Sequence, residues 1–380
     1  MNYRERFEAT IKHQAVDRVP FDLAGTSLTG IEHPQTREKL RQVLGLSEKY
    51  DGWYQKFDER ILEYFDIDIR RVGDILEPES PFAGYISKDE HIDCWGVTRV
   101  FTGMYWDIKN PPLKDATIED LDRYQWPQAE KIDMKKIEEY REQARKLYNE
   151  TNYVVCAEHP MYGVLELGCW MCGFDDFLLR MALEPEFVIK FFDKVLNYQK
   201  KVIEIYYGAV GEFIHFTTSG DDFGTQTGPF MSPVMFDELV KPYYKERISY
   251  TKKFTKGYYF HHTCGSVYPL IPHLIDARVD ILNPIQPGAK DMEPEKLKKD
   301  YGDSITFWGG IDTQHILPYG TREDVKNEVT RVLSALSENG GYVLSPAHNI
   351  QPDVPAENIV AMYEAGKEYF KNKNQSGSSR

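Results

Sequence analysis

The sequence has little of what secreted, membrane-spanning or disulfide-rich proteins contain. It has only five cysteines in 380 residues. This odd number in a long chain favours reduced thiols, and we expect a cytoplasmic protein. No apolar run reaches the roughly 18 residues that a membrane-spanning helix requires. The charged segment Met1–His13 is predicted to be a short amphipathic helix rather than a signal peptide.

Basic residues are also in the minority. The chain has 46 Lys and Arg against 60 Asp and Glu, which gives a formal net charge of −14 at pH 7. A partner with a phosphate backbone requires a basic surface. The basic residues that do cluster, as in Met134–Lys146, have the pattern of a solvated helix face. We therefore expect no nucleic-acid partner, and the acidic balance favours solubility.

Short apolar runs alternate with amphipathic stretches along the chain. The candidate strands are Arg18–Leu23, Ile67–Val72, Tyr153–Ala157, Phe213–Thr218, Tyr258–His262, Val279–Leu282, Ile305–Gly309 and Gly341–Ser345. The clearest helical patterns are Met134–Asn149, Pro185–Tyr207, Pro233–Phe254, Arg322–Glu338 and Pro355–Asn372. Continuously apolar strands are typical of sheets that are buried on both faces. Eight of them alternating with helices predict an α/β fold, a (β/α)8 TIM barrel with an N-terminal helical extension, as one domain over residues 1–372.

Two segments depart from this alternation. Residues 80–115 carry the sequence Asp93-Cys94-Trp95-Gly96 and an aromatic run, Val100–Ile108. We interpret them as a hairpin-like insertion after the second strand. Residues 373–380 are polar and rich in Ser, and we expect them to form a disordered tail.

Polar residues gather where five of the candidate strands end. These segments are Ser219–Gln226, Thr263–Ser266, Asn283–Pro287, Gly310–Asp312 and Pro346–Asn349. The C-terminal ends of the strands carry the active site of a (β/α)8 barrel. We therefore predict that Asp222, Gln286 and Asp312 are catalytic residues in a shared cavity. Of the adjacent Asp221 and Asp222, at most one can point into such a site.

The motif His262-Thr263-Cys264 ends the fifth candidate strand. Residues i and i+2 of a strand point to the same side, so the imidazole and the thiolate can share one metal ion. Zinc accepts nitrogen and sulfur ligands, and His348 at another strand end is the natural third ligand. We predict a zinc site at His262, Cys264 and His348. The alternative is a buried thiol beside a hydrogen-bonded histidine, with His348 as an acid/base or hydrogen-bond donor.

Two neighbouring motifs have simpler interpretations. Cys169-Trp170-Met171-Cys172 is a CxxC, but its flanks are apolar and helical and the chain has no second CxxC. This pattern favours helix packing over redox chemistry or metal binding. His261 alternates to the face opposite His262, so we expect it in the core.

Segments from Arg4-Glu5-Arg6-Phe7 and Asp17-Arg18-Val19-Pro20 to Pro346–Pro355 resemble the uroporphyrinogen decarboxylase superfamily. The resemblance implies a (β/α)8 barrel. The superfamily includes porphyrinogen decarboxylases and zinc methyltransferases that exchange methyl groups with corrinoid cofactors. The decarboxylases carry an arginine-rich loop for the substrate carboxylates, whereas Phe21–Leu28 contains no arginine here. Carboxylates without basic partners would be poorly held.

The methyltransferase branch of the superfamily binds zinc through H-x-C and a distant cysteine near the last strand. His262 and Cys264 match the first two positions, and His348 falls at the third. A set of two histidines and one cysteine carries less negative charge than one histidine and two cysteines. It should make zinc a stronger Lewis acid that suits an oxygen leaving group.

We therefore predict an enzyme that moves a methyl group from a small O-methyl donor, such as a methoxylated aromatic, to cobalt. Zn²⁺ would be the resident metal, and a separate partner protein would supply the corrinoid (cobalamin). Two alternatives stay open. One is a decarboxylase-like lyase that uses Asp222 and His348 without metal. The other is methyl transfer in the opposite sense, from the corrinoid to a thiol or a folate.

Overall fold

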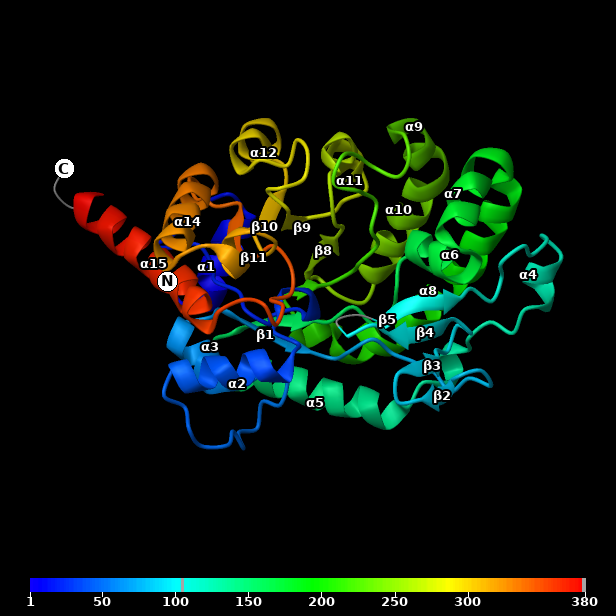
Figure 1. Cartoon of the computed structure of the whole chain (residues 1–380), viewed down its shortest axis with the longest axis horizontal. Coiled ribbons are helices and arrows are strands. Elements are labelled where there is room, and N and C mark those ends of the chain that lie inside the picture. The colour runs from blue at the N-terminus through cyan, green and yellow to red at the C-terminus, as the bar shows by residue number, and fades with distance from the viewer. Residues whose placement is uncertain (104–105, 378–380) are drawn as a thin grey trace.

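The computed structural model describes residues 1–103 and 106–377. Its centre is a curled parallel sheet of seven strands in the order β1-β6-β7-β8-β9-β10-β11 (Figure 1). Their bounds are β1 Ile69–Val72, β6 Val154–Ala157, β7 Phe216–Thr217, β8 Tyr258–His262, β9 Ile281–Ile285, β10 Thr306–Ile311 and β11 Tyr342–Pro346. Almost every residue of these strands is buried, as their continuous apolar runs predict.

The eighth position of the barrel is filled by the first predicted strand, shortened to a single bridge. Phe21 pairs in parallel with Leu344 of β11. On its other side, the backbone N–H of Asp68 donates to the Phe21 carbonyl at 3.0 Å. Pro20 has no N–H to donate, which limits the ladder that this segment can form. The segment therefore closes the ring between β11 and β1, and the predicted (β/α)8 architecture is confirmed.

Helices surround the sheet and α1 covers one end of it. The helices are α1 Tyr3–Ile11, α2 Pro34–Val43, α3 Glu59–Phe65, α4 Asp120–Arg123, α5 Met134–Glu150, α6 Val164–Cys172, α7 Phe174–Leu183, α8 Pro185–Val210, α9 Pro233–Met235, α10 Lys241–Thr251, α11 Ile271–Asp276, α12 Pro294–Tyr301, α13 Ile316–Tyr319, α14 Arg322–Leu336 and α15 Ala356–Gly377. Phe7 and Ile11 of α1 join the barrel core, which includes Phe216, Phe260 and Trp308. The Tyr258 hydroxyl, at the start of β8, donates to Glu8 of α1. This helix therefore closes the N-terminal end of the barrel, and the C-terminal end is the one available for a site.

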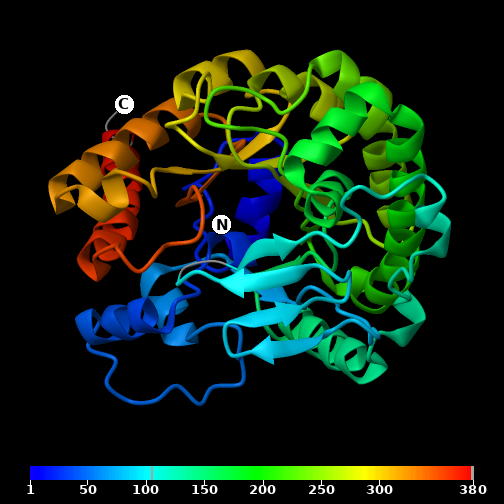
Figure 2. The ribbon, with the colours of Figure 1, turned by 45° about the vertical axis from the view of Figure 1, so that its right-hand side comes forward.

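The insertion after β1 lies within the predicted residues 80–115 but has more strands than a single hairpin. It is a four-stranded antiparallel sheet, and Figure 2 shows it in front of the barrel. Its strands are β2 Gly84–Ser87, β3 Glu90–Ile92, β4 Thr98–Phe101 and β5 Trp106–Asn110. The sequence Asp93–Gly96 forms the turn between β3 and β4, where the Asp93 carboxylate accepts the N–H groups of Trp95 and Val97. The aromatic run Val100–Ile108 supplies the last hairpin, and its residues 104–105 lie outside the described part of the chain.

The C-terminal helix is longer than predicted. α15 extends to Gly377, so most of the segment 373–380 that we expected to be a tail is helical, and residues 378–380 lie outside the described residues. Within residues 1–103 and 106–377, the structure has no helix with the length and apolar character of a membrane span.

Candidate metal centre and active site

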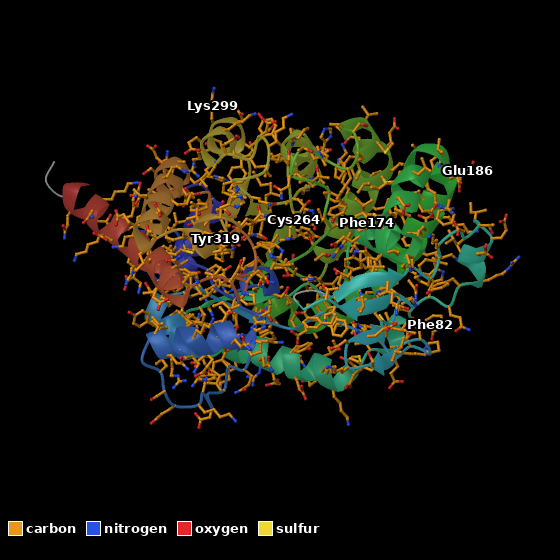
Figure 3. All side chains as sticks on the ribbon, viewed as in Figure 1. Phe82, Phe174, Glu186, Cys264, Lys299 and Tyr319 are labelled. Carbon is orange, nitrogen blue, oxygen red and sulfur yellow. The ribbon has the colours of Figure 1, made fainter. Side chains whose placement is uncertain are left out.

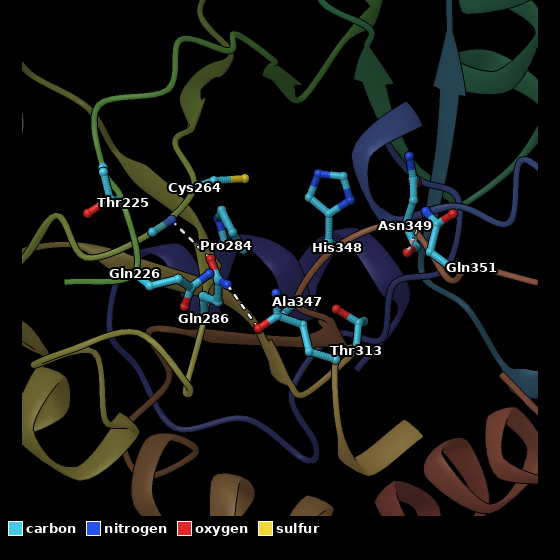
Figure 4. A pocket seen from close by; sticks show the side chains of 13 residues that line it. Thr225, Gln226, Cys264, Pro284, Gln286, Thr313, Ala347, His348, Asn349 and Gln351 are labelled. Carbon is cyan, nitrogen blue, oxygen red and sulfur yellow. Dashed lines mark hydrogen bonds between the residues drawn. The ribbon is translucent and has the colours of Figure 1, made fainter. Parts of the chain in front are cut away.

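Three of the predicted side chains meet at the C-terminal end of the barrel. His262 ends β8, and its Nε2 lies 3.2 Å from the Sγ of Cys264. His348 follows β11, and its ring centroid is 5.4 Å from that of His262. Nitrogen and sulfur atoms of the three side chains all lie within 4.8 Å of one another. Figure 4 shows the sulfur of Cys264 directed toward the His348 imidazole.

A glycine allows the loop that carries Cys264 to pack closely. Gly265 has a φ of +82°, and a Cβ atom there would lie 2.6 Å from the backbone of Gly224 in the loop after β7. Such a conformation and such a contact favour a residue without a side chain. The two loops can therefore approach each other and hold Cys264 beside the end of its own strand.

A buried amide orients His262. The Nδ1 of His262 lies 2.6 Å from the Oδ1 of Asn283, and the Nδ2 of Asn283 donates to the Trp308 carbonyl at 3.2 Å. Because this second bond fixes which end of the amide accepts, His262 must donate its proton from Nδ1. The lone pair of Nε2 is then directed to the side of Cys264. The sequence analysis included Asn283 in the polar segment Asn283–Pro287 but assigned it no role.

Burial sets the protonation of these groups. Desolvation lowers the pKa of His348 to about 4, and it also lowers the pKa of His262. Both imidazoles are therefore neutral near pH 7, the form that binds metals. Burial raises the pKa of the Cys264 thiol, and the negative charges of Asp222 and Glu166 raise it further. A cation between the three side chains would offset this effect and favour the thiolate.

The donor set fits a zinc ion. Ligand bonds of about 2.0–2.3 Å in tetrahedral geometry place ligand atoms roughly 3.3–3.8 Å apart. The observed spacing of up to 4.8 Å needs only small side-chain rotations to reach this range. Two imidazoles and one thiolate are also ligands that zinc accepts, and three protein ligands leave a position open for a reactant.

Of the two adjacent aspartates, Asp222 lies at this centre. Its Oδ1 accepts the backbone N–H of Cys264 at 2.7 Å and lies 4.0 Å from the Nε2 of His262. Asp221 points instead to the start of α6, where it accepts the N–H groups of Leu165 and Glu166 at 3.0 and 2.7 Å. The prediction placed Asp222, not Asp221, in the site, and this is its position in the structure.

The two other predicted catalytic residues differ in their positions. Gln286 lines the cavity at this end of the barrel, and its Oε1 accepts the N–H of Gly265 at 3.0 Å. Asp312 is not among the residues that line the cavity. Its Oδ1 accepts the backbone N–H groups of Gln314 and His315 at 2.6 and 3.0 Å, a local turn in its own loop. The carboxylate of Asp312 is thus held by its own loop, and its catalytic role stays a prediction, because Asp222 and His262 are also absent from the cavity lining.

A second polar cluster at strand ends was missed by the sequence reasoning. Glu158 follows β6, and its carboxylate contacts the Nδ1 of His159 at 2.7 Å and Arg71 of β1 at 3.2 Å. Burial alone would raise the pKa of Glu158, but His159 and Arg71 hold it well below its usual range. The rule that located the other site residues, polar side chains just after a strand, applies equally to Glu158 and His159.

The remaining motifs are in the core, as predicted. Cys169 and Cys172 lie on α6, buried and without a disulfide. His261 is fully buried and packs against the rings of Phe223 and Tyr244.

A cavity of about 600 Å³ opens beside Cys264 and His348 (Figure 4). Its lining residues come from the loops after β7, β8, β9, β10 and β11. They are Gly224, Thr225, Gln226, Cys264, Gly265, Pro284, Gln286, Thr313, Gln314, Ala347, His348, Asn349 and Gln351. Reactants can therefore reach the thiol and the imidazole from the open end of the barrel.

Comparison with known proteins places this site in a family. The family model described as uroporphyrinogen decarboxylase (URO-D) matches residues 104–369. The chain belongs to the uroporphyrinogen decarboxylase family. Curated relatives include the uroporphyrinogen decarboxylases of Vesicomyosocius okutanii, 29% identical over 73 residues, and of Legionella pneumophila strain Lens, 32% identical over 68 residues. These matches cover 19% and 18% of this chain and only 21% and 19% of the two relatives, about a fifth of their length.

Structural similarity to a solved protein extends over more of the chain than these sequence matches do. A methyltransferase from Methanosarcina mazei superimposes with a TM-score of 0.62, covering 97% of this chain and 99% of that one. The two sequences are 17% identical. At this identity the likeness establishes the barrel fold over the whole chain.

Proposed function

We propose that this protein is a methyltransferase that moves a methyl group from a small O-methyl donor, such as a methoxylated aromatic, to the cobalt of a corrinoid. A separate protein would carry the corrinoid. The observation that carries the proposal is the convergence of His262, Cys264 and His348, whose donor atoms lie within 4.8 Å of one another at the open end of the barrel. The similarity of the fold to that of a methyltransferase supports the proposal.

The three side chains would hold one zinc ion. When bound, zinc supplies Lewis acidity at the ether oxygen of the donor, where negative charge develops during methyl transfer. Asn283 accepts a hydrogen bond from the Nδ1–H of His262. This bond keeps the proton on Nδ1 and leaves the lone pair of Nε2 available. Asp222 holds the loop of Cys264 by accepting its backbone N–H. Both residues act on the ligands and so fix the geometry of the site.

The proposed reaction exchanges one bond of the methyl carbon for another. The C–O bond of the donor breaks, and its electron pair stays on the oxygen, which takes up a proton. The methyl carbon forms its new bond with the electron pair of Co(I), so cobalt is formally oxidised to Co(III). An ether is unreactive because its oxygen is a poor leaving group, which is why charge stabilisation at this oxygen is the main requirement of the site.

The surroundings of the cavity suit a protein partner. Phe174, Val234 and Tyr319 lie in segments that follow β6, β7 and β10, and they are 44%, 65% and 77% exposed. Figure 3 shows Cys264 near the middle of the molecule with Tyr319 and Phe174 on either side of it. Exposed apolar side chains that gather into a patch are typical of protein-interaction surfaces. They support docking of the corrinoid protein over the mouth of the barrel.

A lyase without metal is the second candidate, and a specific observation favours it. Glu158 orients the imidazole of His159, which is the arrangement of a general acid or base. The named relatives are decarboxylases, whose carboxylated substrates require basic partners. Arg71 reaches this end of the barrel, but Glu158 and Glu32 already neutralise it.

Metal content and methyl transfer separate these candidates. We expect the purified protein to contain one equivalent of zinc. We also expect it to convert a reduced corrinoid protein to its methyl-Co(III) form when a methyl ether is added. A protein without metal that decarboxylates a small acid would support the lyase. Methylation of a thiol or a folate by the methylated corrinoid, with no reaction of any ether, would reverse the proposed direction.

A further inference from the structure

The cavity beside Cys264 and His348 has an unusual chemical character. Five of its thirteen lining residues carry primary amides, namely Gln226, Gln286, Gln314, Asn349 and Gln351. Thr225 and Thr313 add hydroxyl groups, and no Asp, Glu, Lys or Arg is present in the lining. A primary amide offers two donors and an acceptor without net charge. The lining therefore suits a ligand that is neutral and rich in hydrogen-bonding groups.

The amides surround the candidate metal centre. Gln226 follows β7, Gln286 follows β9, Gln314 follows β10, and Asn349 and Gln351 follow β11. Figure 4 shows Gln226 and Gln286 on the side of Cys264, and Asn349 and Gln351 on the side of His348. A ligand that spans the cavity would therefore meet amides on both sides of the thiol and the imidazole.

Several of these amides have donors to spare. The Oε1 of Gln314 accepts from Gln286 at 3.4 Å, and the Oδ1 of Asn349 accepts from the N–H of Gly30 at 2.8 Å. Within residues 1–103 and 106–377, the Nε2 of Gln314, the Nδ2 of Asn349 and the whole side-chain amide of Gln226 make no hydrogen bond. Gln286 accepts from Gly265 and donates to Gln314, which leaves one hydrogen of its Nε2 without a partner in these two bonds. Gln226 and Gln314 are exposed, so both can turn toward a ligand.

We infer that these amides recognise the edge of the corrin ring, an inference that rests on the proposed function. The corrin ring carries acetamide and propionamide side chains around its cobalt, and two primary amides can pair reciprocally as donor and acceptor. Porphyrinogens carry carboxylates in the same peripheral positions. A carboxylate that loses water against a lining without Lys or Arg is strongly disfavoured. The same lining therefore selects the amidated macrocycle and rejects the acidic one.

Two free corrinoids that differ in this respect test the inference directly. Aquacobinamide keeps the peripheral amides, whereas cobyrinic acid has carboxylates in their place. Their binding to the zinc-loaded protein can be measured by equilibrium dialysis and visible absorbance. We expect cobinamide to bind at least about 10-fold more tightly than cobyrinic acid. Equal binding of the two, or preference for the acid, would overturn the inference.

Variants of the exposed amides identify the residues involved. We expect Gln226→Leu and Gln314→Leu each to weaken cobinamide binding by about 3- to 10-fold, the value of a typical hydrogen bond. Gln314→Lys should improve binding of cobyrinic acid by supplying a cation. Gln143→Leu, an exposed position on α5, is the matched control and should change neither. Unchanged affinities in both cavity leucine variants would contradict the inference.

Failure of the inference differs from failure of the proposed function. If the leucine variants bind cobinamide normally and the enzyme still methylates a corrinoid protein, the amides have no recognition role and the proposed function stands. If zinc-loaded enzyme methylates no corrinoid protein, the proposed function fails. The preference between the two free corrinoids is measured without turnover, and it decides the inference in either case.

Discussion

The two ends of the barrel differ in how their buried polar groups are satisfied. At the closed end, the carboxylate of Asp68 accepts from Arg6 and Arg18 at 2.7 Å each and from the N–H of Phe21 at 2.8 Å. At the open end, burial and neighbouring carboxylates leave the thiol of Cys264 with a raised pKa and no cation beside it. At the closed end, Arg18 and Arg6 offset part of the burial that raises the pKa of Asp68, whereas the neighbours of Cys264 raise the pKa of its thiol further. The open end therefore has groups that a metal ion and a ligand would complete. This contrast separates a structural cluster from a functional one.

The largest effect is expected at the closed end. Asp68→Ala leaves Arg6 and Arg18 without their shared buried partner, which costs about 3–5 kcal/mol when a buried pair is broken. Chemical denaturation should show this loss in the free energy of unfolding. Asp66→Asn is the control, because the ion pair of Asp66 with Arg18 is partly exposed and is worth about 1 kcal/mol or less, and Asn tolerates the φ of +61° at this position. Similar losses in both variants would mean that burial does not distinguish the two pairs.

At the open end, removal of a ligand should affect metal binding and leave folding intact. We expect Cys264→Ala to lose most of its bound zinc, while its unfolding free energy, measured without metal, stays within about 1 kcal/mol of the wild type. Elemental analysis and denaturation measure the two quantities. The double variant Cys169→Ala/Cys172→Ala is the control and should keep its metal. Loss of metal in the double variant alone would move the site to the CxxC.

Loss of the hydrogen bond that orients His262 should lower zinc affinity less than loss of a ligand does. We expect Asn283→Leu to weaken zinc affinity by about 10- to 100-fold, because the Nδ1 proton of His262 loses its acceptor. Asn283→Asp keeps an acceptor and should retain most of the affinity. Competition with a chromophoric chelator measures both variants without turnover. Equal losses in the two variants would indicate that Asn283 contributes packing rather than orientation.

Near neutral pH, the smallest effect is expected from the protonation of His348. The pKa of His348 falls from 6.5 in the unfolded chain to about 4 in the fold because of burial. The unfolded state therefore takes up a proton first as the pH decreases. His348 costs no stability above pH 6.5, and it lowers the free energy of unfolding progressively from there to about pH 4. His348→Gln should reduce this slope in metal-free protein, and an unchanged slope would show that His348 is well solvated.

The barrel could be predicted from the sequence because buried parallel strands leave a strong local signal. Tyr258–His262 was predicted with its observed bounds, and the alternation of residues within it correctly separated His262 from His261. The first strand could not be delimited, since its pairing depends on a distant partner, Leu344, and on the missing N–H of Pro20. The insertion was predicted within its bounds of residues 80–115, but its number of strands was underestimated because short exposed strands lack a continuous apolar run.

The candidate site could be predicted only for residues whose position at the end of a strand determines where their side chains lie. His262, Cys264 and His348 converge because strand ends of a barrel meet at one rim. Asp312 follows a strand as well, but its carboxylate accepts backbone N–H groups of its own loop. The position of Asp312 in the sequence does not reveal that these hydrogen bonds hold its carboxylate. The role of Asn283 depends on contacts with β8 and β10 that only the fold supplies.

The most direct test of the proposed chemistry is the visible absorbance of cobalt. Zinc-loaded enzyme would be mixed with a corrinoid protein held as Co(I) and with a panel of methyl ethers, thioethers and methylamines. We expect the spectrum of methyl-Co(III) to appear with an O-methyl compound, together with the corresponding hydroxyl product, and Cys264→Ala to be inactive. Methylation from thioethers or methylamines alone would contradict the ether donor. No methylation from any donor, with a partner protein of demonstrated competence, would contradict methyl transfer and favour the lyase.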